Sequence, residues 1–158
     1  MIEYKLASSE DDIALARTLF TEYGRSLNFS LCFQDFDQEL AGLPGDYASP
    51  DGRLILVYHR QTPVGCVALR KIDYQICEMK RLYVRPEFRG EGFGRALAET
   101  ALEEAKKIGY RFMRLDTVPE MKEAISLYES IGFKRIPPYR DNPVPGAIYL
   151  EIDLANFE

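Results

Sequence analysis

A glycine-rich segment between two arginines is the part of this sequence whose residue types and spacing are best suited to chemistry. The segment begins at Arg89, ends at Arg95 and carries a glycine at every second position between them. It follows a strand-like run, residues 78–84, and leads into a run with helical periodicity, residues 92–108. Backbone N–H groups at such a loop, with the positive end of a helix dipole behind them, form an anion site that suits a pyrophosphate. The arginines add charge-assisted donors.

Two other phosphate-binding motifs fit this segment less well. A dinucleotide fingerprint, Gly-x-Gly-x-x-Gly, would require a glycine where the chain has Arg95 or Leu97. A P-loop requires Gly-Lys-Ser/Thr, and the sequence contains no such run. The structural alternative is a turn that only lets a helix and a strand pack closely, but three alternating glycines between arginines exceed what such a turn needs.

Two motifs carry a resemblance to a known family. Residues 89–94, Arg-Gly-Glu-Gly-Phe-Gly, resemble the Arg/Gln-x-x-Gly-x-Gly/Ala signature with which GCN5-related N-acetyltransferases (GNATs) bind acetyl-coenzyme A. Residues 124–133 resemble the Ala-x-x-Leu-Tyr-x-x-x-Gly-Phe motif of the same superfamily. The two motifs follow one another in the expected order and separation, and the chain as a whole resembles uncharacterised bacterial members. The resemblance is firm over residues 50–136 and looser at both ends.

The resemblance implies an α/β fold of the mixed α+β type, with a twisted, mixed and mostly antiparallel sheet of about seven strands flanked by about four helices. Hydrophobic periodicity predicts matching elements. The predicted strands are residues 2–6, 54–58, 64–69, 76–84, 112–116, 133–136 and 147–154. The predicted helices start after Ser9 and end at Gly24, and then cover residues 33–43, 92–108 and 121–131. A right-handed crossover makes strand 112–116 parallel to strand 76–84.

The 158 residues suit one domain with a hydrophobic core of its own. We interpret residues 1–158 as a single N-acetyltransferase domain whose cofactor core spans residues 50–136. Acceptor selectivity is then expected from residues 8–47 and 137–150. The first of these segments carries aromatic side chains near carboxylates, which would receive a cationic amine or simply form core: Phe29, Phe33, Phe36 and Tyr47. In the second, the expected acceptor contacts, or equally turn formers, are Arg140, Asp141 and Asn142.

The resemblance also implies which residues contact the cofactor, acetyl-coenzyme A, used as a cosubstrate. These residues are Leu82, Tyr83, Val84, Arg89, Gly90, Glu91, Gly92, Phe93, Gly94, Arg95 and Thr117. Backbone N–H groups of Leu82 and Val84 would face the pantetheine and thioester carbonyls and stabilise the oxyanion. The superfamily commonly has an asparagine before its last helix. This chain instead reads Thr-Val-Pro-Glu-Met over residues 117–121, so Thr117 or the backbone would replace that contact.

Acetyl transfer to an amine needs a neutral amine, an oxyanion donor and a proton for the departing thiolate. Tyr128 matches the superfamily tyrosine proposed to supply that proton; the alternative is a core tyrosine. Glu78 begins the cofactor strand and is the candidate base, acting through water; the alternative is an exposed carboxylate at a strand end. Tyr83 either lines the side of the site that receives the amine or has only a packing role.

Composition excludes several other classes of function. Three cysteines without C-x-x-C spacing and a single histidine argue against a disulfide framework and a metal site. A formal net charge of −5 argues against nonspecific nucleic-acid binding. No apolar run approaches the ~20 residues that cross a membrane, and the N-terminus does not resemble a signal peptide, so we expect a cytoplasmic protein.

The sequence therefore predicts an acetyl-coenzyme A-dependent N-acetyltransferase that moves acetyl to a primary amine by direct transfer in a ternary complex. No cysteine falls in either motif, which disfavours a covalent acetyl-enzyme. Two alternatives stay open: a non-catalytic module that binds acyl-coenzyme A as a sensor or partner, and transfer of a longer acyl group. The partners expected are a coenzyme A thioester and an amine, with neither nucleic acid nor membrane, and the resemblance implies a homodimer.

Overall fold

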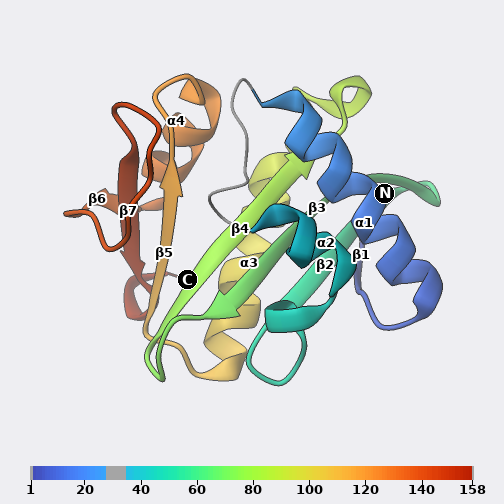
Figure 1. Ribbon diagram of the computed structural model, residues 1–158, viewed down its shortest axis with the longest axis horizontal. Coiled ribbons are helices and arrows are strands. Elements are labelled where there is room, and N and C mark those ends of the chain that lie inside the picture. Colours follow the sequence, from blue (N-terminus) through green and yellow to red (C-terminus); the bar gives the residue numbers. More distant parts are fainter. Residues whose placement is uncertain (1, 28–34, 158) are drawn as a thin grey trace.

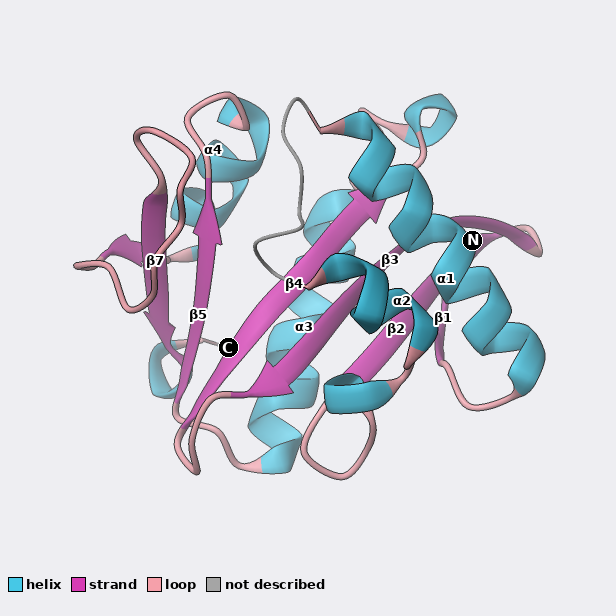
Figure 2. Cartoon of the chain, viewed as in Figure 1, coloured by secondary structure: helices cyan, strands magenta, loops and turns pink. Residues whose placement is uncertain are grey.

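The computed structural model describes residues 2–27 and 35–157, so the predictions that concern Phe29, Cys32 and Phe33 lie outside the described residues. The expected architecture is confirmed: the described chain forms one seven-stranded mixed sheet with helices on both faces (Figures 1 and 2). The strands are β1 (Ile2–Leu6), β2 (Arg53–His59), β3 (Thr62–Lys71), β4 (Ile76–Val84), β5 (Phe112–Thr117), β6 (Lys134–Arg135) and β7 (Ile148–Asp153). The α-helices are α1 (Glu10–Ser26), α2 (Phe36–Ala41), α3 (Phe93–Ile108) and α4 (Lys122–Ile131).

The strands lie in the order β1-β2-β3-β4-β5-β7-β6, and every neighbouring pair is antiparallel except β4 with β5. The helix α3 connects these two parallel strands, as the crossover rule predicts. Apolar side chains on α3 pack on one face of the sheet, and those of α1 pack on the other. The sheet is therefore buried on both sides over its centre, where β3 and β4 are almost continuously buried.

The parallel pair β4–β5 is the weak point of the sheet. These strands pair only through the first three residues of each, from Ile76 opposite Phe112 to Glu78 opposite Arg114. Beyond Glu78, β4 continues along β3 to Val84, whereas β5 continues along β7 to Thr117. The two halves of the sheet therefore diverge, and the backbone groups that face the gap need other partners (Figure 1).

A bulge bends β4 just beyond this divergence. The register of β4 against β3 shifts here, because Tyr83 lies opposite Cys66 and Lys80 lies opposite Ala68. Two residues of β4 therefore face a single residue of β3, and β4 carries one extra residue. Within the extra stretch Arg81 has φ 62°, a left-handed conformation that a non-glycine residue seldom adopts. The bulge therefore changes the direction in which the side chains of β4 point beside the gap.

Two predicted helix boundaries are wrong for identifiable reasons. The first helix continues through Gly24 to Ser26, because this glycine provides space and not a helix end: a Cβ there would lie 2.8 Å from a ring carbon of Phe36. The second helix covers only Phe36–Ala41 of the predicted residues, and it begins after Asp35. The strand predicted over residues 133–136 shortens to Lys134–Arg135; the N–H of Ile136 still donates to the carbonyl oxygen of Tyr149 in β7 at 2.9 Å, and the long loop begins after it.

We predict that Gly65→Ala destabilises the protein by about 1–3 kcal/mol, the usual cost of forcing an extra carbon into a packed core. A Cβ at Gly65 would lie 2.2 Å from the carbonyl oxygen of Tyr83, so β3 and β4 could not keep their spacing at the bulge. Urea unfolding measures the effect. Gly94→Ala is the matched control, because a Cβ there meets only ordinary contacts at 3.8 Å or more and should favour the helix. Equal stability of the two variants would contradict the account.

Candidate active site

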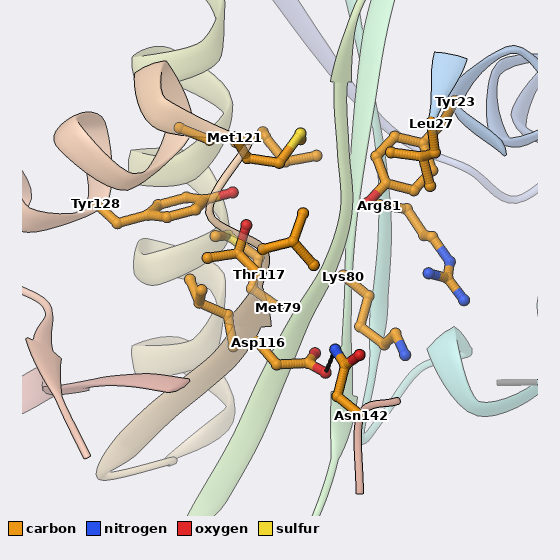
Figure 3. Close-up of a pocket in the computed structure, with 14 residues that line it drawn as sticks. Tyr23, Leu27, Met79, Lys80, Arg81, Asp116, Thr117, Met121, Tyr128 and Asn142 are labelled. Carbon is orange, nitrogen blue, oxygen red and sulfur yellow. Dashed lines mark hydrogen bonds between the residues drawn. The ribbon is translucent and has the colours of Figure 1, made fainter. Parts of the chain in front are cut away.

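Two adjoining cavities lie along the edge of β4 where it has left β5; β5 residues line only the smaller one. The larger, of about 530 Å³, follows the end of β4 and the glycine-rich loop; the smaller, of about 70 Å³, lies beside the divergence of the strands. They share the wall residues Tyr23, Leu27, Leu82, Met121 and Ala124. Figure 3 shows the smaller cavity, with Tyr128 and Met121 from the α4 side on one side of β4 and Tyr23 and Leu27 from α1 on the other. The gap therefore joins the two faces of the sheet.

Most of the residues that the sequence assigned to the cofactor line the larger cavity. They are Leu82, Tyr83, Val84, Arg89, Gly90, Gly92, Phe93 and Gly94. Gly90 and Gly92 have φ values of 83° and 86°, and a Cβ on either would meet no protein atom within 4 Å. Glycine is needed there for its backbone conformation, and the missing side chains leave the N–H groups at the start of α3 accessible to an anion.

Three other predicted cofactor residues lie elsewhere. Glu91 and Arg95 are not among the described residues that line the larger cavity, and Thr117 lines the smaller one. Arg95, on α3, reaches across to α4, where its Nη1 donates to Ser130 Oγ at 2.9 Å. Arg89 keeps its place at the cavity, because its Nε donates to the carbonyl oxygen of Val84 at 3.0 Å.

Tyr128 lines the smaller cavity from α4. Its side chain is 7% exposed, its ring packs at 5.7 Å on the ring of Phe133, and its hydroxyl points toward the gap (Figure 3). Burial raises the pKa of Tyr128 well above its ordinary value, so the phenol stays protonated at neutral pH. A protonated hydroxyl at this position is able to donate a proton.

Glu78 is fully buried at the point where β4 and β5 stop pairing, so it is not the exposed strand-end carboxylate that the sequence left as an alternative. Its carboxylate is the centre of a polar network. Oε1 accepts from Arg70 Nε at 3.0 Å, and Oε2 accepts from Tyr139 Oη at 2.6 Å and pairs with Arg140. Burial alone would raise the pKa of Glu78, but Lys80, Arg140, Tyr139 and Arg70 outweigh it and lower the pKa. Glu78 is therefore ionised.

The network around Glu78 fixes the loop between β6 and β7. Tyr139 and Arg140 both belong to that loop, and a further residue of it, Asn142, lines the smaller cavity. Asn142 Nδ2 donates to Asp116 Oδ2 at 3.1 Å, which joins the loop to β5 (Figure 3). The sequence predicted Asn142 as an acceptor contact or a turn former, and its Oδ1 does accept a hydrogen bond from the N–H of Val144 within the loop, at 3.0 Å. Asp116 was not predicted, because its only signal was its place at the end of a predicted strand.

Lys80 and Arg81 are the buried cations of the smaller cavity, at 6% and 3% exposure. Arg81 Nε and Nη2 donate to the two carboxylate oxygens of Glu39, both at 2.8 Å, which ties α2 to the bulge. Burial is the main reason that the pKa of Lys80 falls to about 7; Arg81 lowers it next, and Glu78 opposes this. The sequence showed these two residues only as a local basic pair.

Comparison with known proteins agrees with this geometry. A family model described as "Acetyltransferase (GNAT) family" matches residues 16–133. An uncharacterised N-acetyltransferase of Schizosaccharomyces pombe is 37% identical over 96% of this chain and 92% of its own. Among solved structures, an acetyltransferase of the GNAT family from Staphylococcus aureus superposes with a TM-score of 0.79 at 17% identity, covering 98% of this chain and 99% of that one. Spermidine N-acetyltransferase from Vibrio cholerae, in complex with coenzyme A and spermine, gives 0.74 at 21% identity over 98% and 96%.

We predict that Gly92→Val weakens the binding of acetyl-coenzyme A more than about tenfold, or ~1.4 kcal/mol, as measured by calorimetry. A branched side chain is strained at φ 86° and would cover the N–H groups that face the cavity. The control is Gly109→Val, at the other end of α3, where φ is 112° and a Cβ likewise meets no atom within 4 Å. It should carry similar strain and keep its affinity; an equal loss in both variants would contradict the assignment of the loop.

We also predict that Lys80→Met stabilises the protein at pH 6 more than at pH 10. Below about pH 7 Lys80 is charged in both states, so the native state bears the full cost of burying that charge. Between about pH 7 and the ordinary pKa of lysine, the unfolded state binds one more proton than the native state. The free energy of unfolding of the wild type therefore increases as pH rises, by at most ~1.4 kcal/mol per pH unit.

Urea unfolding of the wild type and the variant at pH 6, 8 and 10 measures this difference. Lys71→Met is the control, since Lys71 lies exposed at the end of β3 and its substitution removes the same charge from the surface. A gain for Lys80→Met that does not shrink toward pH 10, or the same pH dependence in Lys71→Met, would contradict the burial of a charged Lys80.

Proposed function

The chain belongs to the acetyltransferase (GNAT) family and is an acyltransferase of the acetyl-coenzyme A-dependent N-acetyltransferase type, and we propose that it moves acetyl directly to a primary amine within a ternary complex. The observation that carries this proposal is that the two cavities share a wall at the β4–β5 gap. In the proposal, the larger cavity holds the coenzyme A thioester and the smaller cavity receives the amine. Described elements outside the proposed cofactor core, α1 and the loop after β6, then supply the acceptor side through Tyr23 and Asn142.

Direct transfer agrees with the state of the two described cysteines. Cys66 and Cys77 are fully buried in β3 and β4, and neither is among the residues that line the two cavities. Burial raises the pKa of Cys66 well above its ordinary value and that of Cys77 to about 12, so neither thiol supplies the thiolate that a covalent acetyl-enzyme needs. The burial of these two thiols therefore supports the proposal that the amine attacks the thioester itself.

The proposed reaction forms a C–N bond and breaks a C–S bond. The neutral amine attacks the thioester carbonyl, and backbone N–H groups of Leu82 and Val84, on the strand edge left without a partner, stabilise the oxyanion. As the tetrahedral intermediate collapses, the electron pair leaves with sulfur and Tyr128 donates its proton to the thiolate, so that the products are an N-acetyl amine and coenzyme A. The attacking nitrogen, positively charged in the intermediate, loses one proton to Asp116 or to water, and Tyr128 is later reprotonated.

For Glu78 we propose that it acts at a distance from the amine. Its carboxylate is absent from the described lining of both cavities, and it already accepts hydrogen bonds from Arg70 and Tyr139. Proton transfer from the amine to Glu78 would have to run through water. Asp116 is the one carboxylate among the described residues that line the smaller cavity, and it is the better placed group to hold the amine or accept its proton.

Two experiments separate this proposal from the alternatives. Binding of acetyl-coenzyme A without turnover of any amine in a broad panel would favour a non-catalytic binding module. Faster turnover of propionyl- or butyryl-coenzyme A than of acetyl-coenzyme A would favour a longer acyl donor.

We predict that Tyr128→Phe lowers kcat by about 10²–10⁴-fold, the usual contribution of a positioned general acid, and leaves the KM for acetyl-coenzyme A nearly unchanged. The rate of thiol release with a fixed amine measures both constants. Tyr110→Phe is the matched control, because Tyr110 is also buried but its hydroxyl donates to the carbonyl oxygen of Asp51 at 2.7 Å, outside the two cavities. Full turnover in Tyr128→Phe would exclude Tyr128 as the acid.

A further inference from the structure

The acceptor side of the smaller cavity carries an unusual set of charges for a site that takes an amine. Nine described residues line this cavity and not the larger one: Met79, Lys80, Arg81, Leu115, Asp116, Thr117, Val118, Tyr128 and Asn142. Two of these are buried cations on β4, Lys80 and Arg81, and one is a carboxylate on β5, Asp116. The charges of opposite sign therefore stand on opposite walls of one small cavity.

The bulge in β4 is what places the two cations together. In a regular strand consecutive side chains point to opposite faces of the sheet, so Lys80 and Arg81 would be separated. Here Arg81 has φ 62° and the strand carries an extra residue, and both side chains line the same cavity. Figure 3 shows them extending from β4 toward the α1 and α2 side, away from Tyr128.

The surroundings of these cations leave an excess of positive charge. Among the described residues, four cationic side chains, Arg70, Lys80, Arg81 and Arg140, lie with three carboxylates: Glu39 and Glu78 beside them, and Asp116 on the opposite wall of the cavity. Glu39 is held by Arg81, and Glu78 is shared by Arg70 and Arg140. The low pKa of Lys80 reflects the same field, since Arg81, Arg70 and Arg140 all lower it. A second cation brought to this wall would be repelled, and an anion would be attracted.

We infer that the acceptor is a small amine that itself bears a carboxylate next to its amino group, as a free α-amino acid does. This inference rests on the proposed function and names its substrate class. The acceptor's carboxylate lies against Lys80 and Arg81, and its amino group lies toward Asp116, which Asn142 orients through the 3.1 Å bond. A protein N-terminus or a lysine side chain has no carboxylate at that place, and a polyamine would add a cation to a positive wall.

The test compares matched ligands that differ only in this charge: free α-amino acids and their α-carboxamides, with diamines as a third set. For one or more amino acids, the kcat/KM of the wild type should exceed that for the corresponding amide by on the order of ten- to a hundredfold, the range expected for a charge-assisted contact. In Lys80→Met the preference should fall to within a few-fold, while the affinity for coenzyme A stays that of the wild type. Lys71→Met should keep the preference.

A binding measurement makes the inference independent of turnover. Calorimetry of the coenzyme A-loaded protein with N-acetyl amino acids and N-acetyl amino acid amides should show selective binding of the carboxylates in the wild type and loss of that selectivity in Lys80→Met. If no amine is acetylated but this selectivity is present, the proposed function fails and the inferred ligand class stands. Equal or better binding of the amides, better turnover of amides or diamines, or no binding of either ligand at millimolar concentration would overturn the inference.

Discussion

The pairing of β4 with β5 over only three residues is the constraint on which the rest of this structure depends. Parallel strands normally continue side by side, and their N–H and C=O groups satisfy one another. Here β4 remains paired with β3 and β5 with β7, so beyond Glu78 the facing edges of β4 and β5 do not hydrogen-bond to each other. Buried backbone groups need partners, and in the proposed function the amide-rich pantetheine chain of the cofactor supplies them in the manner of a missing strand. The sheet would then bind its substrate through hydrogen-bonding groups that its own strands leave unpaired.

The network around Glu78 positions one wall of the smaller cavity. A buried carboxylate without partners would be costly, and this one is stabilised by groups from two segments: Arg70 on β3, and Tyr139 and Arg140 in the loop after β6. Because that loop also carries Asn142, the charge network that satisfies Glu78 positions a wall of the smaller cavity. On the other side, Arg81 binds Glu39 of α2, so the bulge and the helix hold each other. Buried ion pairs here position segments that are distant in the sequence.

The sequence predicted the parts of the site that are local in the chain. The glycine-rich loop, the strand before it and Tyr128 on the last helix line the two cavities, and they could be identified because each motif is a run of neighbouring residues. Their roles in binding and catalysis stay predictions. The crossover rule likewise predicted the parallel pairing of the fifth strand. Element boundaries failed where tertiary contacts decided them, as at Gly24, which provides space for Phe36 and does not end its helix.

The parts of the site that depend on long-range contacts could not be predicted. The burial of Glu78 results from partners 8 and 61 positions away in the chain. The positive φ of Arg81 arises from the register of β4 against β3, and no residue type at that position signals it. Without the bulge, an alternating strand would have put Lys80 and Arg81 on opposite faces, and their meeting in one cavity would not be foreseen.

The most direct test of the central claim is a crystal structure of the protein with acetyl-coenzyme A bound. We expect the pyrophosphate on the N–H groups of residues 90–94 and the thioester carbonyl inside the β4–β5 gap, within hydrogen-bonding distance of the backbone N–H of Leu82 or Val84. We also expect the thioester sulfur on the side of Tyr128. A cofactor bound outside the gap, or a gap closed by continued pairing of β4 with β5, would contradict the central claim.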